Sequence, residues 1–175
     1  MREDPGTSSM PRKRQGLMTD SELTLDRAHA LRCEVAAEVL RCFGRLRLKV
    51  TGWSMFPAIW PGDILELERA KRYELSQGQI VVFSRDRRLF VHRIWKTVGS
   101  AIVTRGDAMP HTDPVVSDQE LLGRVTCIER DGQRIQPRTR LASSERVLAG
   151  LVRSSDFAAR VIGVIYSLAE SKASS

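Results

Sequence analysis

The sequence Thr51-Gly52-Trp53-Ser54-Met55-Phe56-Pro57 decides how this chain can fold and what chemistry it can carry. The preceding residues, Leu46-Arg47-Leu48-Lys49-Val50, alternate apolar and charged side chains, which is the pattern of a half-buried strand. Gly52 loosens the backbone where this strand ends, and Pro57 stops any helix from extending back into the loop. Ser54 is therefore held in place and accessible. These residues alone are explained equally well by a strand-to-loop corner whose serine bonds its own backbone.

A helix and a series of short strands surround this stretch. Thr19 and Glu22 have capping-box spacing, and apolar residues recur at helical intervals, which predicts a helix over residues 20–43 that ends at Gly44. Further along the chain, strand-like runs separated by turn residues recur at intervals of about ten residues. The predicted strands cover residues 45–51, 64–68, 79–83, 89–96, 101–104 and 121–130. This pattern favours an antiparallel barrel or sandwich-like sheet over alternating strand–helix units.

The two ends of the chain differ from its middle. Residues 1–18 carry Pro, Ser, Gly and mixed charge without periodicity, which predicts a disordered tail. From Ser143 the pattern is helical again, and Ser154 can begin the cap of a last helix. We expect a mostly β (α+β) protein with flanking helices. Its parts are the tail (1–18), an N-terminal helix (19–44), a β domain (45–140) and a C-terminal helical segment (143–172).

Composition limits the partners and the location of the protein. The 175 residues carry a net charge of +7, which assists contact with anionic surfaces without specifying one. We expect no secretory signal and no membrane span, because no window approaches the ~20 apolar residues that a span needs. The wide apolar stripe of the last predicted helix favours packing on the protein and leaves peripheral membrane contact open. Three unpatterned cysteines are typical of a reducing compartment, so we expect a cytoplasmic protein.

Ser54 needs a base, because an isolated serine hydroxyl is a poor nucleophile at neutral pH. The chain has three histidines. His29 lies in the predicted helix and His111 in a proline-bordered loop. His92 lies in the strand Phe90-Val91-His92-Arg93-Ile94, on a face that is otherwise apolar. A lone imidazole on such a face is more often a buried structural residue, so the motifs around His92 must decide.

Two residues on the predicted helix raise the question of a metal site. His29 and Cys33 are four residues apart on one helix face and could reach a metal ion together. Two ligands without a Cys-x-x-Cys nearby rarely make a site. We therefore expect no metal, and nothing in the sequence implies another cofactor.

Six short motifs resemble the catalytic core of type I signal peptidases and their relatives, which include LexA-type self-cleaving repressors. In chain order the motifs are Ser54-Met55 with Pro57, Gly62-Asp63-Ile64, Gly78-Gln79-Ile80-Val81-Val82-Phe83, Val91-His92-Arg93, Thr104-Arg105-Gly106-Asp107 and Leu122-Gly123-Arg124-Val125. The resemblance covers roughly residues 46–126, and six motifs in the right order are far more specific than any one of them. It implies a serine endopeptidase with an antiparallel β-barrel-like core.

The resemblance also implies roles for individual residues. Most of these peptidases use a lysine base, whereas His92 followed by Arg93 matches the archaeal and endoplasmic-reticulum branch. In that branch an acidic residue after the Gly-Asp motif is assigned to a Ser-His-Asp triad. Ser54 would be the nucleophile and His92 the general base. Asp113 would orient His92, with Asp107 in reserve, although either carboxylate could instead only shape a turn.

Three departures from the family pattern concern the substrate more than the triad. Many members have a serine two residues before the nucleophile, where this chain has Gly52, so the oxyanion would rest largely on backbone N–H groups such as that of Ser54. Trp53, Met55 and Pro57 would support this loop. The transmembrane anchor usual in signal peptidases has no counterpart here. Finally, Ala108-Met109-Pro110 replaces the usual asparagines.

Two other functions compete with a peptidase. The first is a non-catalytic module of the same fold that binds a peptide or a partner protein. The second is a self-cleaving DNA-binding regulator, but only one helix fits into residues 19–43, and no Ala-Gly-type cleavage dipeptide follows it. We therefore expect no nucleic-acid partner. The expected substrate is a leader-like or signal-like segment of a peptide or preprotein, extended against the sheet edges near Ser54, with small side chains beside the cleaved bond.

Overall fold

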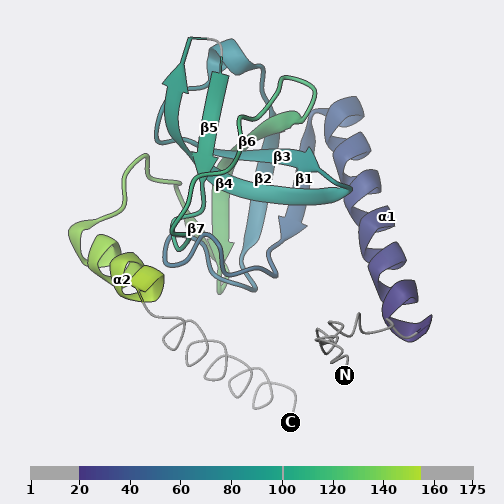
Figure 1. Cartoon of the computed structure of the whole chain (residues 1–175), viewed down its shortest axis with the longest axis horizontal. Coiled ribbons are helices and arrows are strands. Elements are labelled where there is room, and N and C mark those ends of the chain that lie inside the picture. Colours follow the sequence, from purple (N-terminus) through teal and green to yellow (C-terminus); the bar gives the residue numbers. More distant parts are fainter. Residues whose placement is uncertain (1–19, 100, 155–175) are drawn as a thin grey trace, which may run out of the picture.

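The computed structural model describes residues 20–99 and 101–154 of the chain. The elements in this part are α1 (Asp20–Phe43), β1 (Arg45–Lys49), β2 (Ile64–Arg69), the 3-10 helix η1 (Arg72–Glu74), β3 (Ile80–Arg85), β4 (Arg88–Val98), β5 (Ala101–Arg105), β6 (Leu121–Arg130), β7 (Gln133–Ile135) and α2 (Ser143–Ser154). The expected mostly β (α+β) class with a helix on each side of the strands is confirmed (Figure 1). The predicted tail and the predicted last helix beyond Ser154 lie outside the described residues.

The strands form one antiparallel sheet in the order β1-β2-β6-β3-β4-β5. One edge of β6 serves two neighbours, because residues 121–124 pair with β3 and residues 128–130 pair with β7. Among the described residues, β1 pairs only with β2, and residues 88–92 of β4 pair only with β3. The sheet does not close on itself, so the expected barrel-like core is not confirmed.

The sheet is strongly curved. Three strands separate β1 from β4, which would place them about 19 Å apart in a flat sheet. However, Leu48 of β1 and Val91 of β4 pack against the same buried core, and α1 contacts both strands. Curvature therefore brings the unpaired edge of β1 toward the unpaired edge of residues 88–92.

The main core lies between the concave face of the sheet and α1. It contains Ala37, Leu40, Met55, Ile59, Leu65, Leu67, Ile80, Val82, Leu122, Val125 and Ile128. Leu65 and Leu67 are almost fully buried while their neighbours on β2 are half-buried, as the alternation of a strand requires. Because Met55 and Ile59 also belong to this core, the loop that carries Ser54 is attached directly to it.

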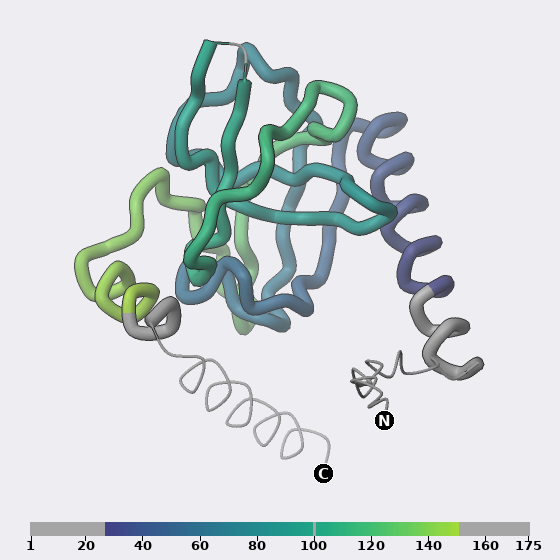
Figure 2. Tube along the Cα trace, in the orientation of Figure 1, coloured from purple at the N-terminus to yellow at the C-terminus, as the bar shows by residue number. Residues whose placement is uncertain are grey.

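The two helices flank the sheet (Figure 1). α1 covers the same residues that its periodicity predicts, and Gly44 follows it with a φ of 75°, a left-handed conformation that glycine adopts without strain. The tip of the hairpin between β3 and β4 reaches α1 (Figure 2), where Arg87 pairs with Glu34 at 2.5 Å. In the described part of the chain, neither α-helix is long and apolar enough to cross a membrane.

Candidate active site

Ser54 lies in the tight turn that follows β1. The Phe56 N–H donates to the Trp53 carbonyl and the Ile59 N–H to the Met55 carbonyl, each over 3.0 Å. Met55 is 2 % exposed, and the cis-bonded Pro57 is also buried. The turn is therefore anchored by its buried side chains, while the Ser54 side chain is only half-buried.

The residues expected to support this loop have different positions. Met55 and Pro57 are its buried anchors. Trp53 is half-buried, with its ring 5.8 Å from the ring of Phe56, which in turn lies 5.1 Å from the ring of Trp60. Gly52 is exposed, and a Cβ atom at this position would meet no other atom within 4 Å. One side of the loop is therefore packed by aromatic rings, whereas the backbone at Gly52 is exposed.

An ion pair between a buried carboxylate and a half-buried arginine connects the end of the same loop to β6. Asp63, whose side chain is 3 % exposed, accepts two hydrogen bonds from Arg130, over 2.9 and 2.6 Å. Asp63 also accepts from the Trp60 N–H (2.8 Å), and Arg130 donates to the Ala58 carbonyl (3.2 Å). The sequence shows Asp63 only as part of a Gly-Asp turn, so its contribution to positioning Ser54 becomes visible only in the folded chain.

The side chains of Ser54, His92 and Asp113 form a continuous hydrogen-bonded series. Ser54 Oγ lies 3.0 Å from His92 Nε2, and His92 Nδ1 lies 2.6 Å from Asp113 Oδ2. An ionised carboxylate can only accept, so Nδ1 carries the ring proton and Nε2 accepts from the Ser54 hydroxyl. His92 is 5 % exposed. The structure thus brings together the three residues expected from the sequence.

Thr104 fixes the carboxylate of this series. Its hydroxyl donates to Asp113 Oδ2 over 2.7 Å, and its carbonyl accepts from the Asp113 N–H over 2.8 Å. Burial is the largest influence on the pKa of Asp113 and raises it, but hydrogen bonds from His92 and Thr104, together with nearby positive charge, outweigh burial and leave that pKa below its ordinary value. Asp113 is therefore ionised at neutral pH. Sequence reasoning missed Thr104, although a threonine in an otherwise apolar part of its strand was a signal.

The loop after β5 packs directly against Ser54. The Ala108 N–H donates to the Ser54 carbonyl over 2.9 Å. A Cβ atom on Gly106 would lie 2.5 Å from that carbonyl oxygen and 3.2 Å from His92 Nε2, so only glycine fits between them.

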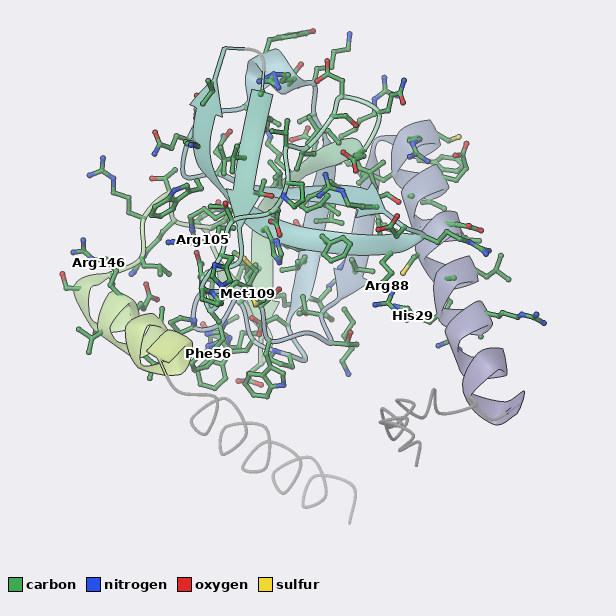
Figure 3. All side chains as sticks on the ribbon, viewed as in Figure 1. His29, Phe56, Arg88, Arg105, Met109 and Arg146 are labelled. Carbon is green, nitrogen blue, oxygen red and sulfur yellow. The ribbon has the colours of Figure 1, made fainter. Side chains whose placement is uncertain are left out.

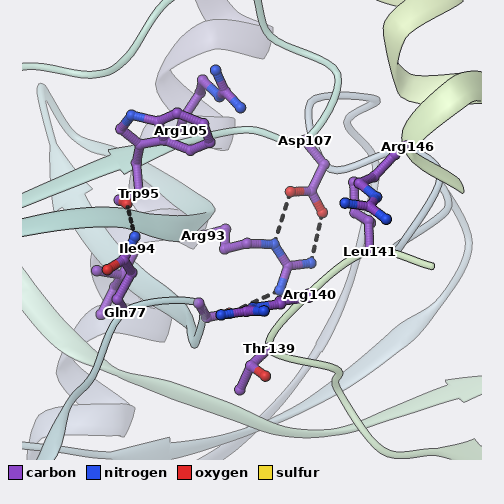
Figure 4. Close-up of a pocket in the computed structure, with 11 residues that line it drawn as sticks. Gln77, Arg93, Ile94, Trp95, Arg105, Asp107, Thr139, Arg140, Leu141 and Arg146 are labelled. Atoms are coloured by element: carbon purple, nitrogen blue, oxygen red, sulfur yellow. Dashed lines mark hydrogen bonds and ion pairs between the residues drawn. The ribbon is translucent and has the colours of Figure 1, made fainter. Parts of the chain in front are cut away.

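The reserve carboxylate, Asp107, has a different partner. It accepts two hydrogen bonds from Arg93, over 2.9 and 2.7 Å, inside a cavity of about 620 Å³ (Figure 4). Arg93 also donates to the carbonyls of Gly78 and Arg138. Because consecutive side chains of a strand point to opposite faces, Arg93 leaves β4 on the face opposite to His92. Asp113, and not Asp107, contacts His92.

A cleft of about 430 Å³ opens beside Ser54. Its walls come from α1, from the end of β1 with the Ser54 loop, and from residues 89–91 of β4. Both strands present edges that have no partner strand in the described part of the chain. Such an edge can accept an extended peptide as an additional strand.

Searches with this chain found no matching protein-family model and no matching curated protein. The chemistry open to the site therefore follows from its own geometry. A hydroxyl, an imidazole and an ionised carboxylate in one hydrogen-bonded series are the groups that acyl transfer requires. His29 and Cys33 approach each other at 3.6 Å, but no three metal-ligating side chains gather among the residues that the structure describes.

Proposed function

We propose that this protein is a serine endopeptidase of the signal-peptidase type, which cleaves an extended, leader-like or signal-like segment of a peptide or preprotein. The observation that carries the proposal is the series from Ser54 through His92 to Asp113, placed at a cleft between two unpaired strand edges. The motif resemblance and the cleft support a peptide substrate, and the hydrogen-bonded series supports covalent catalysis.

In the proposed reaction, His92 accepts a proton and then donates it, first when the acyl-enzyme forms and again when it is hydrolysed. His92 Nε2 removes the hydroxyl proton as Ser54 Oγ attacks the scissile carbonyl, and the same proton then passes to the leaving amine. His92 then removes a proton from a water molecule as its oxygen attacks the acyl carbonyl, the ester bond to Ser54 Oγ breaks, and the proton passes from His92 to Oγ. Asp113 holds the ring in the required tautomer and stabilises the imidazolium formed in both steps. Backbone N–H groups around Ser54 would bind the oxyanion.

Labelling with a fluorophosphonate probe tests the proposal. The wild-type protein should be labelled at Ser54 and should cleave members of a degenerate peptide library, whereas Ser54→Ala should do neither at an unchanged melting temperature. Ser144→Ala is the control, because Ser144 is an exposed serine on α2, away from the cleft. Labelling that survives in Ser54→Ala would assign the reaction elsewhere. Peptide binding without labelling or cleavage would favour the non-catalytic module.

A further inference from the structure

The charged side chains that line the cleft are basic. Arg32 of α1 and Lys49 of β1 line it together with His29, and no aspartate or glutamate that the structure describes does. The rest of the lining is mostly apolar and includes Leu48, Val50, Leu89, Phe90 and Val91. The cleft is therefore an apolar groove with positive charge on its border. We refer to Arg32 and Lys49 as the basic rim.

The basic rim has no acidic partner in the described part of the chain. Neither Arg32 nor Lys49 forms a salt bridge with any described residue, and both are exposed. The positions three and four residues from Arg32 on α1 hold Ala28, His29, Val35 and Ala36. By contrast, Arg47 on the same strand as Lys49 pairs with Glu129. The two rim cations can thus pair with a ligand without losing an internal partner.

The helix α1, which carries Arg32 of the basic rim, is anchored to the rest of the fold. Cys33 and Ala37, on the inner face of α1, are buried. Glu34, the acidic residue nearest to Arg32 in sequence, is bound to Arg87 at the β3–β4 turn. His29 projects from α1 on the side that faces the sheet (Figure 3). The backbone that carries Arg32 is therefore fixed relative to the cleft.

We propose that the basic rim selects substrates with an acidic side chain at one position away from the cleaved bond. The inference rests on the proposed peptidase function and adds a substrate class to it. An extended peptide in the cleft would bury apolar side chains against β1 and β4 and place a carboxylate at Arg32 and Lys49. A carboxylate gains from two cations there, whereas a lysine at the same position is repelled.

A positional peptide library tests this specificity on the full-length chain. A cleaved sequence is varied with Glu, Gln or Lys at each of several positions on both sides of the scissile bond, and products are identified by mass spectrometry. At one position, Glu should raise kcat/KM over Lys by about tenfold, since exposed ion pairs contribute modestly. The preference should shrink between about 20 mM and about 500 mM salt, because screening weakens exposed pairs.

Charge reversal separates the rim from general electrostatics. The double variant Arg32→Glu with Lys49→Glu should prefer Lys over Glu at that same position. Arg27→Glu reverses a charge on the same helix outside the cleft and should keep the wild-type preference. Cleavage without a Glu preference, or a preference that the double variant retains, overturns the inference and leaves the peptidase intact. If no peptide is cleaved and Ser54 is not labelled, both proposals fail.

Discussion

Asp113 is held by hydrogen bonds with Thr104 and His92. Because asparagine has nearly the same shape as aspartate, the charge of this side chain can be removed with little change in the shape of the site. Asp113→Asn should lower kcat by roughly 10⁴, because an amide can donate to Nδ1 and leave Nε2 protonated, unable to accept the Ser54 proton. Asp86→Asn is the matched control, because Asp86 lies in an exposed turn with a φ of 50° that asparagine tolerates. Comparable cleavage by Asp113→Asn and wild type would remove Asp113 from the mechanism.

Gly106 offers a test of close packing around Ser54, with Gly150 of α2 as its control. Gly106→Ala should reduce kcat/KM by about 10² or more, because its Cβ would displace the Ser54 carbonyl or the His92 ring, and small displacements of reacting groups are costly. Gly150→Ala should leave activity near the wild-type level, because Gly150 is exposed on α2 outside the cleft and a Cβ there meets no atom within 4 Å. Equal activity of the two variants would show that the loop after β5 does not hold Ser54.

Residues that carry their own chemistry could be predicted from the sequence, whereas residues that act through contacts with distant segments could not. Ser54 and His92 could be named because each carries its own chemistry inside a short motif, and Asp113 could be named by its spacing from the motif Thr104-Arg105-Gly106-Asp107. Gly106 and Thr104 appear in the same motifs, but their importance depends on atoms that approach from other segments: the Ser54 carbonyl in one case and the Asp113 carboxylate in the other. Sequence alone does not show such approaches.

At the scale of elements, the ion pair between Asp63, at the end of the Ser54 loop, and Arg130 of β6 should contribute to the stability of the fold. Arg130→Ala should lower the free energy of unfolding by about 2–4 kcal/mol, because it leaves the carboxylate of Asp63 buried without its charge partner. Arg134→Ala removes an exposed arginine that pairs with Glu66 and should change stability little. Urea unfolding of both variants measures the difference. Equal stability of the two variants would contradict the anchoring role of Asp63.

Long elements, in which the apolar pattern recurs several times, could be located from the sequence. Their arrangement in space could not. The 24 residues of α1 and the ten residues of β6 coincide with the predicted bounds, because periodicity and turn residues mark both. β7 and η1 were missed, since three residues carry no readable period. The order of the strands was not predicted either, because short runs with similar alternation do not specify which strand pairs with which.

For the molecule as a whole, Glu120 makes stability depend on acidity. Its carboxylate binds Arg85 and the N–H and hydroxyl of Ser117, and these hydrogen bonds, led by that of Arg85, outweigh burial and lower the pKa of Glu120 from 4.5 to about 2. A depressed pKa contributes stability above pH 4.5, and that contribution is lost as the pH falls toward 2. The stability difference between wild type and Glu120→Gln should therefore shrink over this interval.

Urea unfolding at several pH values between about 6 and 2 measures this difference. Ser144→Ala serves as the control, because Ser144 is exposed on α2 and carries no group that titrates in this interval. Its stability difference from wild type should stay nearly constant over the interval. A difference for Glu120→Gln that is equally constant would mean that the ion pair with Arg85 does not stabilise the fold.

The unpaired edge of β4 has a consequence for amide hydrogen exchange. The Ile94 N–H donates to the Gln79 carbonyl on the β3 side, so the amides of His92 and Phe90 face β3, and those of Val91 and Leu89 face outward. In the free protein, the deuterium uptake of Val91 and Leu89 should be faster than that of their two neighbours. A bound, non-cleavable peptide that pairs with this edge should slow the outward pair alone, giving protection at every second residue. A ligand held only by its side chains would not slow deuterium uptake at every second residue of this edge.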